Sequence, residues 1–304
     1  MPATPATDPT SVVLPAVLAL VAIVATLGIL WKSLFNRSAP LPTVVLADGE
    51  IVSSVPLPPE LPVGRVPVWF YRPLDLLGVA FVFLIFAGMA IASSQVKQPA
   101  VDSLAPEVLV VNIGFQFLLA GIVAVTILFR VGVIEWLGLR WPRWYLVFLI
   151  APGAVIGMWM LFGGLQAAGF MEWLKSMGVD QIQDSVELLQ KSNNPLTLSL
   201  MVAAAVVVAP ICEEIVFRGY LYPILKRFSG VWVAGLCSAL LFSCAHGNLV
   251  ALLPLLIFGI VQVVIYEKTG SLWAPIAVHF CFNSASVLAQ LAVRYYDLPV
   301  EMPS

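Results

Sequence analysis

Long apolar stretches separated by short polar segments dominate the hydrophobicity pattern of this chain. A helix that crosses the hydrocarbon core of a bilayer needs about 20 mostly apolar residues. The sequence contains eight stretches near this length, and we expect a transmembrane helix in each: residues 12–31, 74–94, 108–129, 144–168, 196–217, 231–247, 250–266 and 272–293. The pattern therefore predicts an all-α, polytopic membrane bundle of about eight helices.

The polar segments between these stretches differ in character. The turns at 246–248 and 267–270 are short, so the last three helices should be antiparallel neighbours. Residues 38–73 hold eight prolines and cannot form a long helix, so we expect a Pro-rich linker. Asp48-Gly49, between two short apolar runs of that linker, predicts a small hairpin.

Residues 171–192 carry apolar side chains at spacings of three and four, with acidic and amide side chains between them. This spacing is typical of an amphipathic helix. We expect a helix that lies on the outer membrane interface, although the same segment could gate access to a cavity.

Composition agrees with a membrane protein. The chain of 304 residues is 61% hydrophobic and 11% charged, against about 45–50% and 25% in soluble proteins. The formal net charge of -2 gives no large basic field, so we expect membrane lipid as a partner and no nucleic acid.

The positions of the basic residues predict an orientation. Of the 15 lysines and arginines, 11 fall on one side of the predicted spans and four on the other. Because cytoplasmic loops are enriched in lysine and arginine, the linker at 38–73 should be cytoplasmic and both termini outside. Residues 1–11 contain no basic residue, so we interpret the first span as a membrane anchor and not as a cleaved signal.

Two adjacent carboxylates, Glu213 and Glu214, follow an apolar run, and Arg218 comes soon after. A charged side chain near the bilayer centre costs roughly 2.5–3.5 kcal/mol on insertion scales, so such a pair predicts a functional site. Residues four apart share a helix face, whereas adjacent residues point about 100° apart. Glu214 should therefore pair with Arg218 while Glu213 faces elsewhere. Glu213 is shallow if the helix ends at Arg218, and about 20 Å deep if it continues to 226–227.

The two histidines of the chain lie in later apolar segments. Phe242 and His246 are four residues apart, as are His279 and Asn283, so each pair should share a helix face. Solvated helix ends and core histidines are the plainer interpretation. We prefer a polar site, because three separate apolar helices each carry side chains that are expensive in lipid. The meeting of these helices requires tilt or re-entrance.

A glutamate, two imidazoles and a carboxamide in a membrane cavity suit one kind of chemistry. A carboxylate that is free of its neighbouring arginine can take a proton from water. The resulting hydroxide can attack an amide carbonyl, and histidine and asparagine donors can hold the developing oxyanion. The residues therefore favour peptide hydrolysis without a covalent intermediate.

These motifs are EExxxR at Glu213–Arg218, FxxxH at Phe242–His246 and HxxxN at His279–Asn283. In this order they resemble the CPBP family of intramembrane proteases, which includes type II CAAX prenyl endopeptidases and bacterial self-immunity proteins. The resemblance covers roughly residues 195–292. It implies a peptidase of a bacterial plasma membrane that acts on a peptide or lipidated, CAAX-type protein.

The resemblance also implies roles for the motif residues. Glu213 would be the water-activating base with His246 beside it. His279 and Asn283 would be oxyanion-binding or metal-facing groups. Glu214 and Arg218 would support the site through an ion pair. Family members have been described as metalloproteases and as metal-independent glutamate proteases, and Glu213, His246 and His279 could hold zinc with one position open.

The expected organisation is an anchor (1–37), the linker (38–73), membrane helices with the interfacial helix (74–194), a protease-like core (195–292) and a tail (293–304). Two non-enzymatic functions are alternatives to the predicted peptidase activity. A membrane scaffold or self-immunity protein, or an ion-coupled transporter, can also keep buried acidic and histidine side chains. Inverted repeats would favour a transporter, and none is evident between residues 74–168 and 196–293.

Overall fold

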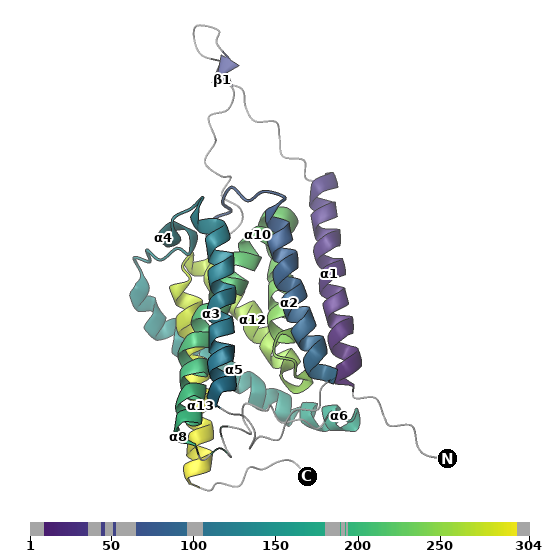
Figure 1. Cartoon of the computed structure of the whole chain (residues 1–304), viewed down its shortest axis with the longest axis vertical. Coiled ribbons are helices and arrows are strands. Elements are labelled where there is room, and N and C mark those ends of the chain that lie inside the picture. The colour runs from purple at the N-terminus through teal and green to yellow at the C-terminus, as the bar shows by residue number, and fades with distance from the viewer. Residues whose placement is uncertain are drawn as a thin grey trace, which may run out of the picture.

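The structure is a computed structural model, and it describes residues 9–35, 44–45, 51–52, 65–95, 106–179, 189, 192 and 194–296. Within these residues seven helices are long and apolar enough to cross a membrane. They run side by side in one bundle (Figure 1). The predicted all-α membrane fold is confirmed.

The amino-terminal half supplies four of the spanning helices: α1 (Thr10–Phe35), α2 (Asp75–Gln95), α3 (Pro106–Leu128) and α5 (Val147–Ala167). Shorter helices join them: α4 (Val133–Trp136), η2 (Trp144–Leu146) and α6 (Phe170–Ser176). In the linker, β1 (Val44–Val45) pairs antiparallel with β2 (Ile51–Val52), with Val44 opposite Val52. This strand pairing agrees with the predicted hairpin, whose turn at Asp48-Gly49 lies outside the described residues.

The prediction of one helix over residues 171–192 is wrong about the length of that helix. α6 ends at Ser176, and Gly178 has a positive φ of 81°. Only glycine adopts this backbone readily, so the chain leaves the helix at this point. α6 lies across the end of the bundle where α1 begins and α13 ends (Figure 1). The predicted apolar positions at 182 and 186 lie outside the described residues.

The fifth span is one continuous helix of 35 residues with two widened turns. In order it comprises α8 (Pro195–Ala203), a π-helical segment η3 (Ala204–Val208), α9 (Ala209–Glu214), a second π-helical segment η4 (Ile215–Leu221) and α10 (Tyr222–Ser229). Each π-helical segment comes just before a proline, Pro210 or Pro223. Proline lacks an N–H and clashes with the preceding turn, so a wider turn accommodates it. Because the helix continues to Ser229, Glu213 lies about 20 Å from that end.

The sixth predicted span is too short to cross a bilayer. α11 (Val231–Cys244) has 14 residues, about 21 Å, against the roughly 30 Å of the hydrocarbon core. A turn follows, and the Asn248 side chain caps α12 (Leu249–Thr269) by accepting from the backbone N–H groups of Val250 and Ala251. The last described helix is α13 (Trp273–Tyr295). Seven spans and one short helix thus replace the eight expected spans.

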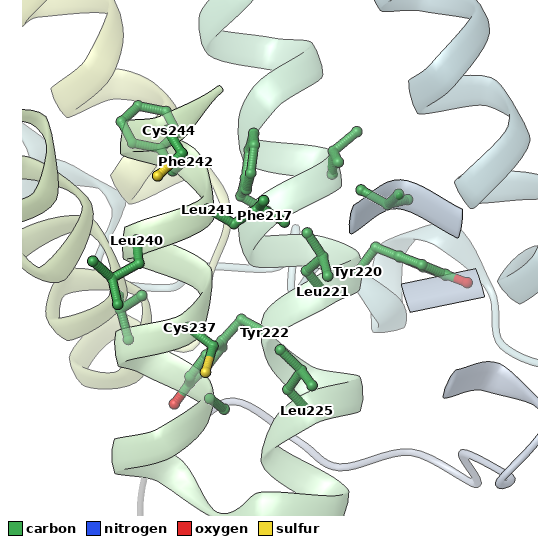
Figure 2. Close-up of a cluster of buried hydrophobic side chains, with 14 of the residues drawn as sticks. Phe217, Tyr220, Leu221, Tyr222, Leu225, Cys237, Leu240, Leu241, Phe242 and Cys244 are labelled. Carbon is green, nitrogen blue, oxygen red and sulfur yellow. The ribbon is translucent and has the colours of Figure 1, made fainter. Parts of the chain in front are cut away.

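Side chains of η4, α10 and α11 form the centre of the core. Figure 2 shows aromatic, leucine and cysteine side chains of these neighbouring helices lying between them. The described cysteines are free thiols, and Cys212, Cys237 and Cys244 are buried. α11 and α12 also approach closely, because a Cβ on Gly259 would lie 2.9 Å from the Cβ of Ala239. Small residues allow this close packing of the two helices.

A buried ion pair fixes the end of the bundle from which the linker leaves. The Lys226 ammonium donates to Glu267 Oε1 at 2.5 Å and to the Val66 carbonyl at 2.9 Å. The Tyr222 hydroxyl donates to the same glutamate oxygen. These bonds tie the linker at Val66 to α10 and α12.

Candidate active site

Glu214 is the centre of a buried polar cluster. Its side chain is fully buried, as is that of Arg218, and Arg218 Nη1 lies 3.0 Å from Glu214 Oε1. The same oxygen accepts from Gln262 Nε2 at 3.1 Å and faces His279 Nδ1 at 3.0 Å. The ion pair between Glu214 and Arg218 that the helix spacing predicted is present in the structure. The other five motif residues are Glu213, Phe242, His246, His279 and Asn283.

Phe242 supports the arginine and both histidines. The Arg218 Cζ atom lies 4.5 Å from the centre of the Phe242 ring, a cation–π contact in a buried setting. The ring also makes edge contacts with His246 and His279, at centroid distances of 5.0 and 5.9 Å. The phenylalanine of the FxxxH motif thus packs against both imidazole rings.

Glu213 faces away from Arg218, as expected for a residue adjacent to Glu214. Its side chain is 23% exposed, and its Oε2 atom lies 3.9 Å from His279 Nε2. That oxygen has no hydrogen-bond partner among the described residues. His279 therefore lies between the two glutamates, with Nδ1 toward Glu214 and Nε2 toward Glu213.

The hydrogen bonds of the histidines constrain their protons. His246 Nδ1 lies 2.9 Å from the Phe242 carbonyl oxygen, which can only accept, so Nδ1 carries the hydrogen. Neutral His246 then has a lone pair on Nε2. Glu214 is ionised beside Arg218, so His279 Nδ1 is likewise the donor to it. Each imidazole is thus fixed through one nitrogen and leaves Nε2 for chemistry.

Asn283 is tied to the π-helical segment of the fifth span. Its Nδ2 donates to the Ala205 carbonyl at 2.7 Å, across from α13 to η3. A carboxamide has two N–H groups. One is used in this bond, so the other can serve as a donor.

One cavity of about 780 Å³ is lined by the four predicted catalytic residues Glu213, His246, His279 and Asn283. Its other walls are mostly apolar and come from α5, α6, α8, α12 and α13. The cavity lies in the half of the bundle toward α6, the end where α1 begins and α13 ends (Figure 1). The supporting pair, Glu214 and Arg218, is buried behind its wall.

The predicted zinc ligands do not fit a zinc site in this arrangement. Structural and catalytic zinc sites need at least three protein ligands close together. Among the residues that the structure describes, no three His, Cys, Asp or Glu side chains form such a group. Glu213, His246 and His279 share a cavity without forming a ligand cluster.

Three further polar residues of the cluster escaped the sequence analysis. Gln262 bonds both Glu214 and the Pro275 carbonyl. The Ser238 hydroxyl donates to the Phe217 carbonyl, and Trp136 Nε1 donates to the Gly219 carbonyl. The last two satisfy carbonyls of η4. Of the three, only Gln262 could have been recognised from the sequence, because a single amide side chain within an apolar span costs free energy in the membrane.

The fold and this site define an integral membrane protein with a polar, acid–histidine centre inside its helical bundle. Residues 195–285 match the model of the family described as type II CAAX prenyl endopeptidase Rce1-like. "Putative membrane peptidase YdiL" of Bacillus subtilis (strain 168) is 35% identical over 98 residues, which are 32% of this chain and 40% of that protein. No solved structure matches the chain.

The matched segment contains all three motifs and every residue of the polar cluster except Trp136. Residues 195–285 are therefore similar to type II CAAX prenyl endopeptidases of the Rce1-like family, and this similarity supports a membrane peptidase. The chain spans 40% of the length of this relative, and the family match begins at residue 195, after the amino-terminal helices.

Proposed function

We propose that this protein is an intramembrane endopeptidase that hydrolyses a peptide bond of a membrane-associated substrate with water activated by Glu213. The observation that carries the proposal is the different setting of the two glutamates. Glu214 is fully buried, and its Oε1 atom is shared by Arg218, Gln262 and His279, whereas the Glu213 side chain is 23% exposed and lines the cavity. A carboxylate in this state can accept a proton from a bound water.

The reaction uses the two glutamates differently. A water between Glu213 and the lone pair of His246 Nε2 gives one proton to Glu213, and its oxygen attacks the scissile carbonyl carbon. The tetrahedral oxyanion accepts hydrogen bonds from the second N–H of Asn283 and from His279 Nε2 when that imidazole is protonated. Protonated Glu213 then delivers its proton to the leaving nitrogen as the C–N bond breaks. The products are a carboxylic acid and an amine, and the glutamate is restored.

The supporting residues keep this arrangement in place. Glu214 accepts from His279 Nδ1 and so holds the ring with Nε2 toward Glu213. Arg218 balances the charge of Glu214 and donates a second bond to the Gly259 carbonyl at 3.2 Å. Neither side chain touches the cavity, so both act through His279.

The test is cleavage by the purified full chain in detergent or vesicles. A mixed library of hydrophobic peptides and a farnesylated CAAX peptide are the substrates, and the variants are Glu213→Gln, His246→Ala and the exposed-carboxylate control Glu172→Gln. Loss of a general base lowers the rate by about 10²–10⁴. We expect such a loss for Glu213→Gln and a normal rate for Glu172→Gln.

Two outcomes would count against the proposal. Cleavage by Glu213→Gln at the wild-type rate would refute the mechanism. A wild-type protein that cleaves no peptide of either class would favour the competing function, a membrane scaffold that keeps the polar cluster for helix pairing.

A further inference from the structure

The cavity extends well beyond the proposed catalytic residues, and its far half is not purely apolar. His279, Asn283, Ser286 and Gln290 of α13 all line it. They are separated by four, three and four residues, so they lie along one helix face. At about 1.5 Å per residue this polar strip is roughly 16 Å long.

A fifth polar side chain faces the same cavity from another helix. Gln166, near the end of α5, lines the cavity together with apolar neighbours such as Phe162 and Phe170. Ser286 donates its hydroxyl to the Phe282 carbonyl at 2.9 Å, which leaves the oxygen able to accept. The far half thus presents two carboxamides and one hydroxyl oxygen among apolar walls.

The charges of the lining residues restrict what can bind. Among the described residues that line the cavity, Glu213 is the sole carboxylate, and lysine and arginine are absent. A buried charge needs a partner of opposite sign, because its transfer from water is otherwise too costly. A free terminal carboxylate or a charged side chain therefore finds no oppositely charged side chain among the described residues that line the far half.

An extended peptide segment has the complementary requirement. Its N–H and C=O groups lose water inside an apolar cavity and must find partners there. Carboxamides both donate and accept, so they match a peptide backbone, which does the same. At about 3.3 Å per residue, the strip matches roughly five residues of extended chain.

We propose that the polar strip of α13, which runs from His279 and Asn283 to Ser286 and Gln290, binds, together with Gln166 of α5, the backbone of an uncharged, extended segment of the substrate polypeptide. This inference rests on the proposed function and specifies its substrate. The scissile bond is then internal to an apolar stretch, and the neutral residues beside it occupy the far half of the cavity.

The test compares peptides that share one cleavable apolar sequence. One is neutral, one carries a lysine within the five residues beside the scissile bond, and one ends there in a free carboxylate. A farnesylated CAAX peptide is the fourth substrate. We expect the neutral peptide to be cleaved with a KM at least about 10-fold below that of either charged peptide. Equal KM values for these three, or preferred cleavage of the farnesylated peptide, would overturn the inference.

Variants test the strip itself. Gln166→Leu and Gln290→Leu remove a polar group while keeping the side-chain size, and Gln116→Leu on α3 is a matched control away from the cavity. A neutral hydrogen bond contributes enough for about a 3- to 10-fold rise in KM with little change in kcat. Gln166→Glu should in turn lower the KM for the lysine peptide relative to the neutral one.

The failures of the two proposals are distinguishable. A wild-type protein without activity refutes the peptidase. An active protein whose KM is the same in Gln166→Leu, Gln290→Leu and Gln116→Leu refutes only the strip. Thermal unfolding of each variant separates a binding defect from misfolding, since a correctly folded variant with a raised KM supports the strip.

Discussion

The buried ion pair between Glu214 and Arg218 gives the sharpest prediction for stability. Glu214→Gln keeps the size of the side chain and an oxygen that can accept, but it removes the negative charge. Arg218 then retains a full charge with a fully buried side chain. Removing one partner of a buried pair typically destabilises a protein by about 3–5 kcal/mol. For a chain of this size, that loss corresponds to a fall in Tm of about 5–15 °C.

The protein contains its own probe for this measurement. Cys212, Cys237 and Cys244 are buried free thiols, so a thiol-reactive fluorescent dye reports on unfolding without an added label. The matched control is Glu135→Gln. Glu135 and Arg140 also form an ion pair, but at 4.0 Å and with side chains 49% and 81% exposed. An exposed pair contributes less than about 1 kcal/mol, so this variant should unfold like wild type.

A double variant decides whether charge is the cause. In Glu214→Gln with Arg218→Met, both charges are gone and an apolar chain of similar length fills the space. Apolar replacements of buried pairs are often neutral or stabilising. We therefore expect the double variant to recover at least half of the lost Tm. If it were less stable than Glu214→Gln alone, or if Glu214→Gln unfolded like wild type, the argument from uncompensated charge would be wrong.

Three further predictions follow from other parts of the structure. Gly259→Ala should lower the Tm by several degrees, because the added Cβ would meet the backbone of α11. Gly88→Ala is the control, since open space surrounds that position and its Tm should not change. Equal Tm values for the two variants would contradict the close packing. Cleavage should survive a chelator, since the described residues form no three-ligand cluster, and loss of activity with recovery on added zinc would contradict this. If the basic loops are cytoplasmic, an impermeant thiol reagent added outside intact cells should label the Ser176→Cys variant and not the Arg227→Cys variant. The reverse labelling pattern would show that the predicted orientation is wrong.

The sequence predicted those parts of the site that depend on spacing within one helix. The pairing of Glu214 with Arg218 follows from a separation of four residues, and so does the contact of Phe242 with His246. The length of α11 was overestimated, because apolar composition does not reveal where a helix ends. α11 stops at Cys244, and the next helix starts only at Asn248, whose capping side chain is a local signal.

Contacts between helices could not be predicted in the same way. Gln262 on α12 donates to Glu214 on α9, and one turn earlier on α12 the Gly259 carbonyl accepts from Arg218. Trp136, on α4, donates to the Gly219 carbonyl in the π-helical segment η4, 83 residues away in the sequence. Both contacts depend on backbone geometry that no residue spacing encodes.

The position of His279 between the two glutamates links stability to catalysis. Nδ1 lies 3.0 Å from Glu214 Oε1 and Nε2 lies 3.9 Å from Glu213 Oε2. In the serine-protease triad, a carboxylate that fixes a histidine in the correct tautomer is worth up to about 10⁴ in kcat. We therefore expect Glu214→Gln to lower kcat by on the order of 10- to 1,000-fold, measured well below its Tm so that the protein is folded. The Glu135→Gln control should keep full activity. If Glu214→Gln proved unstable but fully active, Glu214 would serve only the fold, and His279 would be held in place by its packing against Phe242 and Phe258.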